Sequence, residues 1–266
     1  MSVKKEANGR RSVFVEVEVP GTPEQVWDAI ASGPGVTAWF VPCEMEQRVG
    51  GKITMDFGPG MKSEAAITRF EPPRMFAAES NNFGPQAPTF ATEWHVEARA
   101  GGTCLVRVTH SLFSETDDWD NQLTGTESGW PAYFRVLRLY LTHFRGQPCT
   151  LAMLSGSAKD QDAAWKTITQ TLALTDQQPG AEVRAIEGAP ALRGTLEFLS
   201  APGKHDVLLR MSEPGQGACA FSVYSYGGHV GVVAYFYFYG AEAKANAERE
   251  RPRWQAWMDQ HFPMKS

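Results

Sequence analysis

Apolar and polar residues alternate soon after the N-terminus, in VFVEVEV (residues 13–19), where every second residue is valine. A period of two predicts a strand with one buried face. The next segment, TPEQ at residues 22–25, combines an N-cap, proline at the first helical position and glutamine three residues after the cap. We therefore expect a short helix that ends near Ser32-Gly33-Pro34-Gly35, followed by a second short turn that carries Trp39 and Phe40.

Alternation returns in four later segments of the first half, which are GGKITMDFGPG, SEAAITRFEPPRMFAAES, TEWHVEA and TCLVRVTHSLF. Turn residues separate these segments, so the order predicts an antiparallel meander. The segment GWPAYFRVLRLYLTHFRG then repeats apolar residues at helical spacing, at Trp130, Phe134, Leu137 and Leu141. The first half thus reads as α+β, with a strand, short helices, a run of strands and one long amphipathic helix.

Four features of this half resemble a known family. They are TPEQVWDAI, the pair Gly50-Gly51, RFEPPRMFAAES, and the GW that opens the last helix. Together they are similar to the activator-of-heat-shock-ATPase-homologue branch of the START-related, SRPBCC helix-grip superfamily, over about residues 12–145. The resemblance implies a curved antiparallel sheet wrapped around a long C-terminal helix, with an apolar pocket between them. Members bind lipids, sterols, polyketides or other hydrophobic molecules, some catalyse cyclisation or dehydration, and one eukaryotic subgroup stimulates a chaperone ATPase.

The opening pattern returns 138 residues later, where Asp160 corresponds to Thr22 and a tryptophan follows each cap at the same distance. The same offset places Leu151 and Met153 on the core face of a strand. Further strand patterns follow, and then a helical tail that we expect Pro252 to kink or restart. An internal duplication explains this order. The alternative is an extension that packs onto the first domain.

These patterns divide the chain into three expected segments. They are a flexible tail over residues 1–11, a helix-grip domain over 12–147, and a second, degenerate helix-grip-like domain over 149–262. In the second domain the run AYFYFYG makes one strand aromatic on both faces, with Tyr235, Tyr237 and Tyr239 on one face and two phenylalanines on the other. Such a strand is covered on both sides. We expect the tyrosine face to form an interdomain or homodimer contact.

Composition excludes several classes of function. Hydrophobic residues make up 42% and charged residues 21% of the 266, and the net charge is −5. Because basic residues cluster only in the first dozen positions, nucleic acid is not an expected partner. The four cysteines are scattered without CxxC spacing, so we expect neither a zinc site nor a disulfide framework, and no cofactor. No apolar run approaches the roughly 20 residues of a membrane span and no signal peptide is visible, which predicts a cytoplasmic protein.

Aromatic residues supply the candidate site. If the resemblance holds, a set of apolar side chains converges between sheet and long helix. The set is Trp39, Phe40, Met55, Phe57, Met61, Phe76, Trp94, Phe113, Trp130, Phe134 and Leu137. We expect the first domain to bind a small hydrophobic or amphipathic molecule there. The same positions also suit ordinary core packing, which leaves that interpretation open.

Candidates for acid–base catalysis are fewer. His110 has the inward parity of Val106 and Val108, and Glu64 lies on a strand after a turn, so either could project into the pocket. The alternatives are a strand-end histidine and an exposed glutamate. No nucleophile, metal or nucleotide motif is visible. A cyclase or dehydratase acting on a polyketide-like substrate, and a regulator of a chaperone ATPase, are therefore alternative functions.

An acidic segment, SETDDWD, precedes the long helix and contains Glu115, Asp117, Asp118 and Asp120. Such a cluster could bind a cation or gate the mouth of the pocket. A solvated acidic loop is the competing interpretation.

Overall fold

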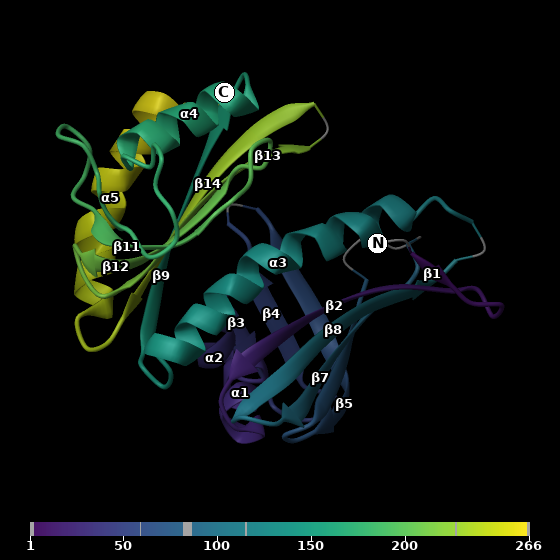
Figure 1. Ribbon diagram of the computed structural model, residues 1–266. Helices are drawn as coiled ribbons and strands as arrows, with labels where there is room; N and C mark the ends of the chain where they lie inside the picture. The colour runs from purple at the N-terminus through teal and green to yellow at the C-terminus, as the bar shows by residue number, and fades with distance from the viewer. Residues whose placement is uncertain (1–2, 59, 82–86, 115, 227, 265–266) are drawn as a thin grey trace. The chain divides into compact units, whose positions relative to one another are not determined.

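The valine alternation near the N-terminus forms strand β2 (Arg10–Pro20) in the computed structural model (Figure 1), and Val13 and Val19 are buried. Helix α1 (Pro23–Ile30) begins at the predicted capping box. The Thr22 amide donates to Gln25 Oε1 at 3.0 Å, and the Gln25 amide donates to Thr22 Oγ1 at 3.4 Å. Helix α2 (Gly33–Thr37) follows directly. Local sequence therefore explains the start of the fold.

The structure describes residues 3–58, 60–81, 87–114, 116–226 and 228–264, and the chain divides into two compact units, Met1–Gly146 and Gln147–Ser266. The strands of the first unit, besides β2, are β1 (Lys4–Lys5), β3 (Cys43–Met45), β4 (Lys52–Asp56), β5 (Lys62–Glu71), β6 (Met75–Ser80), β7 (Phe90–Arg99) and β8 (Thr103–Phe113). They form one antiparallel sheet in the order β1-β2-β8-β7-β6-β5-β4-β3. Helix α3 (Asp120–His143) lies across its face (Figure 1), which confirms the expected α+β helix-grip class.

Helix α3 begins about nine residues earlier than its sequence suggests. The Gly129-Trp130-Pro131 segment is typical of a helix start, yet Pro131 lies inside the helix. The earlier turns are held by Leu123, whose side chain is fully buried and packs in a cluster with Val13, Phe90 and Leu112. Contacts distant in sequence thus extend the helix beyond its local start signal.

Residues 4–11 form a strand, a turn and the start of β2 where we expected a flexible tail. Strand β1 pairs with β2, with Lys4 opposite Ser12 and Lys5 opposite Arg11. The Arg11 side chain is 8% exposed and donates from Nε to the Ser114 carbonyl at 3.0 Å. A basic N-terminal segment is ordered here because acidic partners lie across from it.

The second unit has strands β9 (Cys149–Ala158), β10 (Glu182–Arg184), β11 (Arg193–Leu199), β12 (Asp206–Glu213), β13 (Gly217–Tyr226) and β14 (His229–Tyr239). The sheet order is β10-β11-β12-β13-β14-β9. As in the first unit, the first long strand pairs with the last one, and a C-terminal helix, α5 (Ala243–His261), packs against it. The two units share this arrangement, and the interpretation of the second as a shorter copy of the first stays a prediction.

The offset of 138 residues holds for the helix but not for the strand before it. Helix α4 (Gln161–Thr171) begins at Asp160, whose Oδ1 accepts from the Ala163 amide at 2.7 Å. In β9, however, Ala152 and Leu154 are the residues in the core, whereas we placed Leu151 on that face. The predicted parity of β9 was therefore wrong, because its own alternation is weak and pairing with β14 decides which face is buried.

Helix α5 continues through Pro252 rather than restarting there. It buries the predicted apolar side, Trp254, Trp257 and Met258, against the sheet. Phe236 and Phe238 of β14 face this core, and the Phe236 ring centroid lies 5.0 Å from that of Trp254. On the other face Tyr237 and Tyr239 are buried and Tyr235 is half-buried, and the expected interface through them stays a prediction.

Candidate functional site: a buried aromatic cluster around His110

His110 occupies the inward face of β8 and is 4% exposed. Its Nε2 atom accepts a hydrogen bond from Trp130 Nε1 of α3 at 2.7 Å, and its Nδ1 atom lies 3.0 Å from Thr92 Oγ1 of β7. An indole N–H can only donate, so Nε2 carries no proton. In the neutral ring the proton is therefore on Nδ1, which donates to the Thr92 hydroxyl.

The His110 ring is packed between two aromatic rings. Its centroid is 5.1 Å from that of Phe90 and 5.7 Å from that of Trp130, with interplanar angles of 23° and 15°. Burial among these rings lowers the pKa of His110 to about 3. The imidazole is therefore neutral near pH 7. A base with so low a pKa accepts a proton poorly at that pH, which argues against His110 as a general base.

Most of the predicted pocket residues meet in one cluster of rings under α3. Trp39 lies near its centre, 6.1 Å from Trp94, 6.4 Å from Trp130 and 6.3 Å from Phe134 between centroids. The buried members predicted from sequence are Trp39, Phe40, Phe76, Trp94, Trp130, Phe134 and Leu137. Because these rings touch one another, they occupy the space between sheet and helix that we expected to be an open pocket.

One edge of the cluster is less deeply buried. Phe57 and Met55, at the end of β4, are half-buried, and so is Tyr133 of α3. The Phe40 ring joins this edge to the interior, with centroids 5.6 Å from Phe57 and 4.5 Å from Tyr133. Near the centre of the cluster, Trp39 is held by a hydrogen bond from its Nε1 to the Ala29 carbonyl at 2.9 Å. The cluster therefore has an anchored interior and a more accessible edge.

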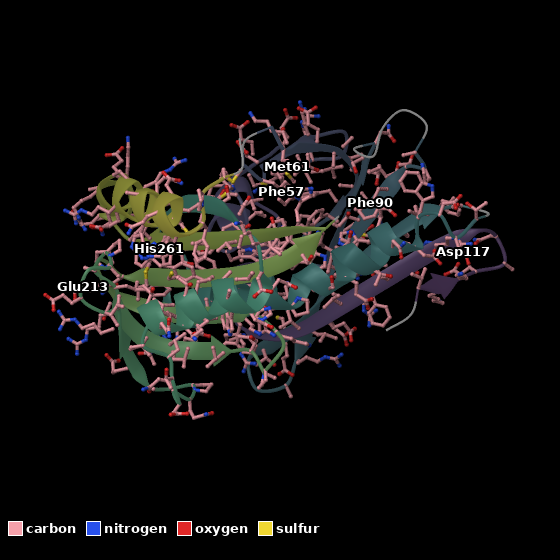
Figure 2. The ribbon with its side chains drawn as sticks, turned by 90° about the horizontal axis from the view of Figure 1, so that it is seen from above. Phe57, Met61, Phe90, Asp117, Glu213 and His261 are labelled. Atoms are coloured by element: carbon pink, nitrogen blue, oxygen red, sulfur yellow. The ribbon has the colours of Figure 1, made fainter. Side chains whose placement is uncertain are left out.

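Two predicted pocket residues lie outside the cluster. Met61, in the turn between β4 and β5, is 64% exposed, and Phe113 is 62% exposed (Figure 2 labels Met61). Alternation explains Phe113: His110 and Leu112 face inward, so Phe113 must face outward. Assigning either residue to the pocket was wrong.

Glu64 also lies at the surface. Its side chain is 59% exposed, and one carboxylate oxygen lies 2.6 Å from Lys52 Nζ on the neighbouring strand. The assignment of Glu64 as a pocket carboxylate was therefore wrong. Of the two catalytic candidates, only His110 lies in the interior.

The residues that complete the His110 site were missed in the sequence. Thr92 and Phe90 share the inward parity of Trp94 on β7, and extending that alternation back from Trp94 would have found both. The short strand predicted there began only at Thr92.

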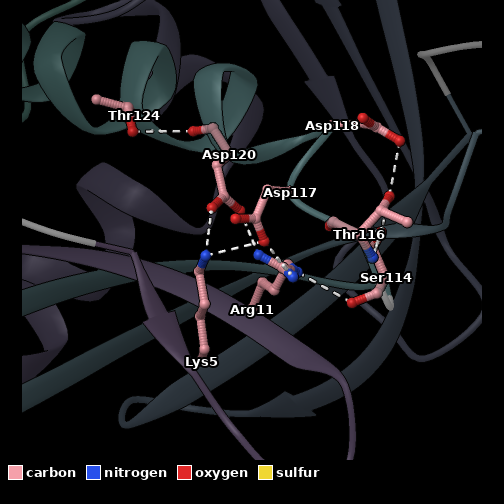
Figure 3. Close-up of polar contacts among 8 residues, drawn as sticks. All are labelled: Lys5, Arg11, Ser114, Thr116, Asp117, Asp118, Asp120 and Thr124. Carbon is pink, nitrogen blue, oxygen red and sulfur yellow. Dashed lines mark hydrogen bonds and ion pairs between the residues drawn. The ribbon is translucent and has the colours of Figure 1, made fainter.

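The acidic segment before α3 is paired with the cationic side chains of β1 and β2 (Figure 3). Asp117 lies 2.7 Å from Arg11 and 2.9 Å from Lys5, and Asp120 lies 2.8 Å and 3.0 Å from the same two groups. Hydrogen bonds from Lys5 and Arg11 lower the pKa of Asp117. These carboxylates are neutralised within the chain and are not a cation site; Glu115 lies outside the described residues.

Other possible sites are limited within the described ranges. One surface cavity of about 420 Å³ is lined by residues 5–11 and Ser114, and another of about 340 Å³ lies on the solvent side of the sheet beside Arg69 and His95. Neither is lined by the aromatic cluster. The described residues contain no group of three or more His, Cys, Asp or Glu side chains that could hold a metal ion. In the same part of the chain, no helix is both long and apolar enough to span a bilayer.

Comparison with known proteins identifies a family for the first unit. Residues 20–142 match the family described as activator of Hsp90 ATPase homologue 1-like protein, which confirms the resemblance. No curated protein matches the chain.

Similar solved structures include CalU16 from Micromonospora echinospora, with 20% identity, 53% of this chain and 83% of that chain covered, and a TM-score of 0.42. DynU16, described as a protein in the dynemicin biosynthetic locus, has 18% identity, with 92% and 94% covered and a TM-score of 0.44. The Aha1 dimer from Colwellia psychrerythraea has 18% identity, with 51% and 98% covered and a TM-score of 0.42.

Proposed function

We propose that the first unit, whose residues 20–142 match the activator of Hsp90 ATPase homologue 1-like family, binds a small, flat, apolar or amphipathic molecule between its sheet and α3. The observation that carries the proposal is the cluster of contacting rings around one neutral histidine. Aromatic pairs contribute about 0.5–1.5 kcal/mol beyond their burial. When a flat ligand displaces one of these side-chain rings, it makes similar contacts with the remaining rings. The displacement therefore costs little free energy.

The polar groups of the cluster limit the chemistry of the ligand. His110 is neutral, and its hydrogen bonds join it to Trp130 and Thr92. A charge brought into this interior would have no opposite charge beside it among these three residues, and an unpaired buried charge is costly. The part of the ligand that reaches His110 is therefore uncharged, and any charged group stays at the more accessible edge near Phe57.

The cluster is closed, so binding requires side chains to move. Phe40 and Tyr133 are the rings in position to move, because Tyr133 belongs to the half-buried edge and Phe40 joins that edge to the interior. The first turn of α3 is held by the ion pairs of Arg11 with Asp117 and Asp120. Access from the Phe57 edge leaves those ion pairs intact.

Native mass spectrometry of the purified chain, followed by thermal shift with 2-naphthol and decanoic acid, tests the proposal. A ligand that binds the folded state raises the Tm. We expect Phe40→Leu, which removes the ring at the accessible edge, to reduce the shift. Phe14→Leu is the control, because Phe14 is exposed on the solvent side of the same sheet. Protein that is isolated empty, with no Tm change for either compound, would refute binding.

A catalytic role at the same site has weaker support. The enzyme alternative requires a buried group with a displaced pKa, and His110 meets that condition. Burial moves the pKa of His110 further below neutral pH, however, and both ring nitrogens already have hydrogen-bond partners. We therefore favour binding without catalysis.

A further inference from the structure

Trp254, on the core-facing side of α5, is 1% exposed. Its ring is surrounded by those of Phe236, Trp257 and Phe221, with centroids at 5.0, 5.5 and 5.7 Å. Its Nε1 atom is buried, and no hydrogen-bond acceptor reaches it among the described residues. Leaving a buried donor unsatisfied costs about 1–3 kcal/mol, so native proteins rarely do so without a reason.

Two buried indoles in the first unit differ from Trp254 in this respect. Trp39 donates to the Ala29 carbonyl and Trp130 donates to His110. The nearest acidic side chain along α5 is Glu250, one turn before Trp254 and 1% exposed. Its carboxylate accepts from Arg249 at 2.6 Å and from Arg253 at 3.2 Å. The carboxylate is thus engaged by two arginines rather than by the indole.

A buried water does not suit this position. A water in a protein interior makes about three hydrogen bonds. The ring neighbours of Trp254 are aromatic, and the core cluster that contains it is built from apolar side chains. A water at Nε1 would therefore exchange one unsatisfied group for another.

We infer that the second unit binds, at Trp254, a neutral aromatic molecule with one hydrogen-bond acceptor, such as an aryl ketone. The carbonyl oxygen of such a molecule accepts from Nε1, and its remaining surface is apolar like the neighbouring rings of Phe221, Phe236 and Trp257. Because Trp254 is buried, these rings must move to admit the molecule. Arg249 and Arg253 are paired with Glu250, so a ligand carboxylate is not required. The inference concerns the second unit and does not depend on binding in the first.

Isothermal titration of the full chain with 9-fluorenone and fluorene tests this. The two compounds have nearly the same shape and differ by the carbonyl oxygen. Satisfying the indole N–H should make fluorenone bind about tenfold more tightly than fluorene. Trp254→Phe keeps an aromatic ring without the N–H, so it should bind both compounds equally. Trp165→Phe, a half-buried indole of the same unit, should retain the preference.

One further variant keeps the outcomes distinct. Trp130→Phe alters the first unit, so a fluorenone preference that persists in this variant assigns it to the second unit whatever the fate of the first-unit proposal. Equal affinities in the wild type, a preference retained by Trp254→Phe, or no binding of either compound would overturn the inference.

Discussion

Replacing His110 by phenylalanine tests the central contacts of the aromatic cluster. The change keeps a planar ring of similar size between Phe90 and Trp130 but removes the acceptor of the Trp130 indole and the partner of Thr92. A buried donor left unsatisfied costs about 1–3 kcal/mol. We expect His110→Phe to lower the free energy of unfolding by about 2 kcal/mol at pH 7.

The same substitution should change how stability depends on pH. The pKa of His110 is about 3 in the folded chain, against about 6.5 in the unfolded chain. Between these values the unfolded chain binds more protons, so the stability of the wild type falls as the pH falls, by up to about 1.4 kcal/mol per pH unit from this group. His110→Phe lacks this loss. A deficit of about 2 kcal/mol at pH 7 is therefore cancelled near pH 5, and below about pH 5 the variant becomes the more stable protein.

Urea denaturation followed by tryptophan fluorescence at a series of pH values from 7 to 4.5 measures this crossing. Because the two units can unfold in separate transitions, the free energies are compared for the transition that His110→Phe shifts. His143→Phe is the control, because His143 is exposed near the end of the same helix, and we expect it to follow the wild-type curve. Parallel curves for wild type and His110→Phe would refute the conclusion that His110 is buried and neutral.

Two further predictions concern the first turns of α3. Arg11→Met removes the cation that binds Asp117 and Asp120 and should lower the free energy of unfolding, whereas Lys5→Met, at a more exposed cation, should lower it by less. Urea denaturation measures both, and equal effects would contradict the assigned burial. Leu123→Ala should cost about 3 kcal/mol and speed amide hydrogen exchange in the helix before Trp130. Gly125→Ala meets open space at its Cβ and should instead slow exchange there; unchanged exchange in both variants would show that these turns are not held by the Leu123 contact.

The beginnings of both units follow from local sequence. The capping residues Thr22 and Asp160 bond as their positions predict, because a cap depends on residues only three apart. The strand β8 coincides with its predicted segment, since its alternation is strong. The family resemblance rested on such local features and is confirmed for the first unit.

Parity was less informative where alternation was weak or a strand ended. The inward parity of His110 is confirmed, and the outward parity of Phe113 could have been inferred from it. For β9 the repeat offset placed Leu151 on the core face, which was wrong, and pairing with β14 puts Ala152 there. A register shift of one residue exchanges the two faces, so only the partner strand settles such cases.

Sequence by itself determined the helix caps and the strongly alternating strands, and for those strands it also determined which side chains point inward. Tertiary structure decided what those side chains meet. The partners of His110 lie 18 and 20 residues away on β7 and α3, and the partners of Arg11, namely Asp117 and Asp120, lie just before α3 and at its first residue. Which face of the sheet a side chain occupies follows from the period of two residues. The space between the sheet and α3, however, depends on how α3 packs. The packing of α3 filled the expected pocket with rings. In the second unit, the packing of α5 left the Trp254 indole without an acceptor among the described residues.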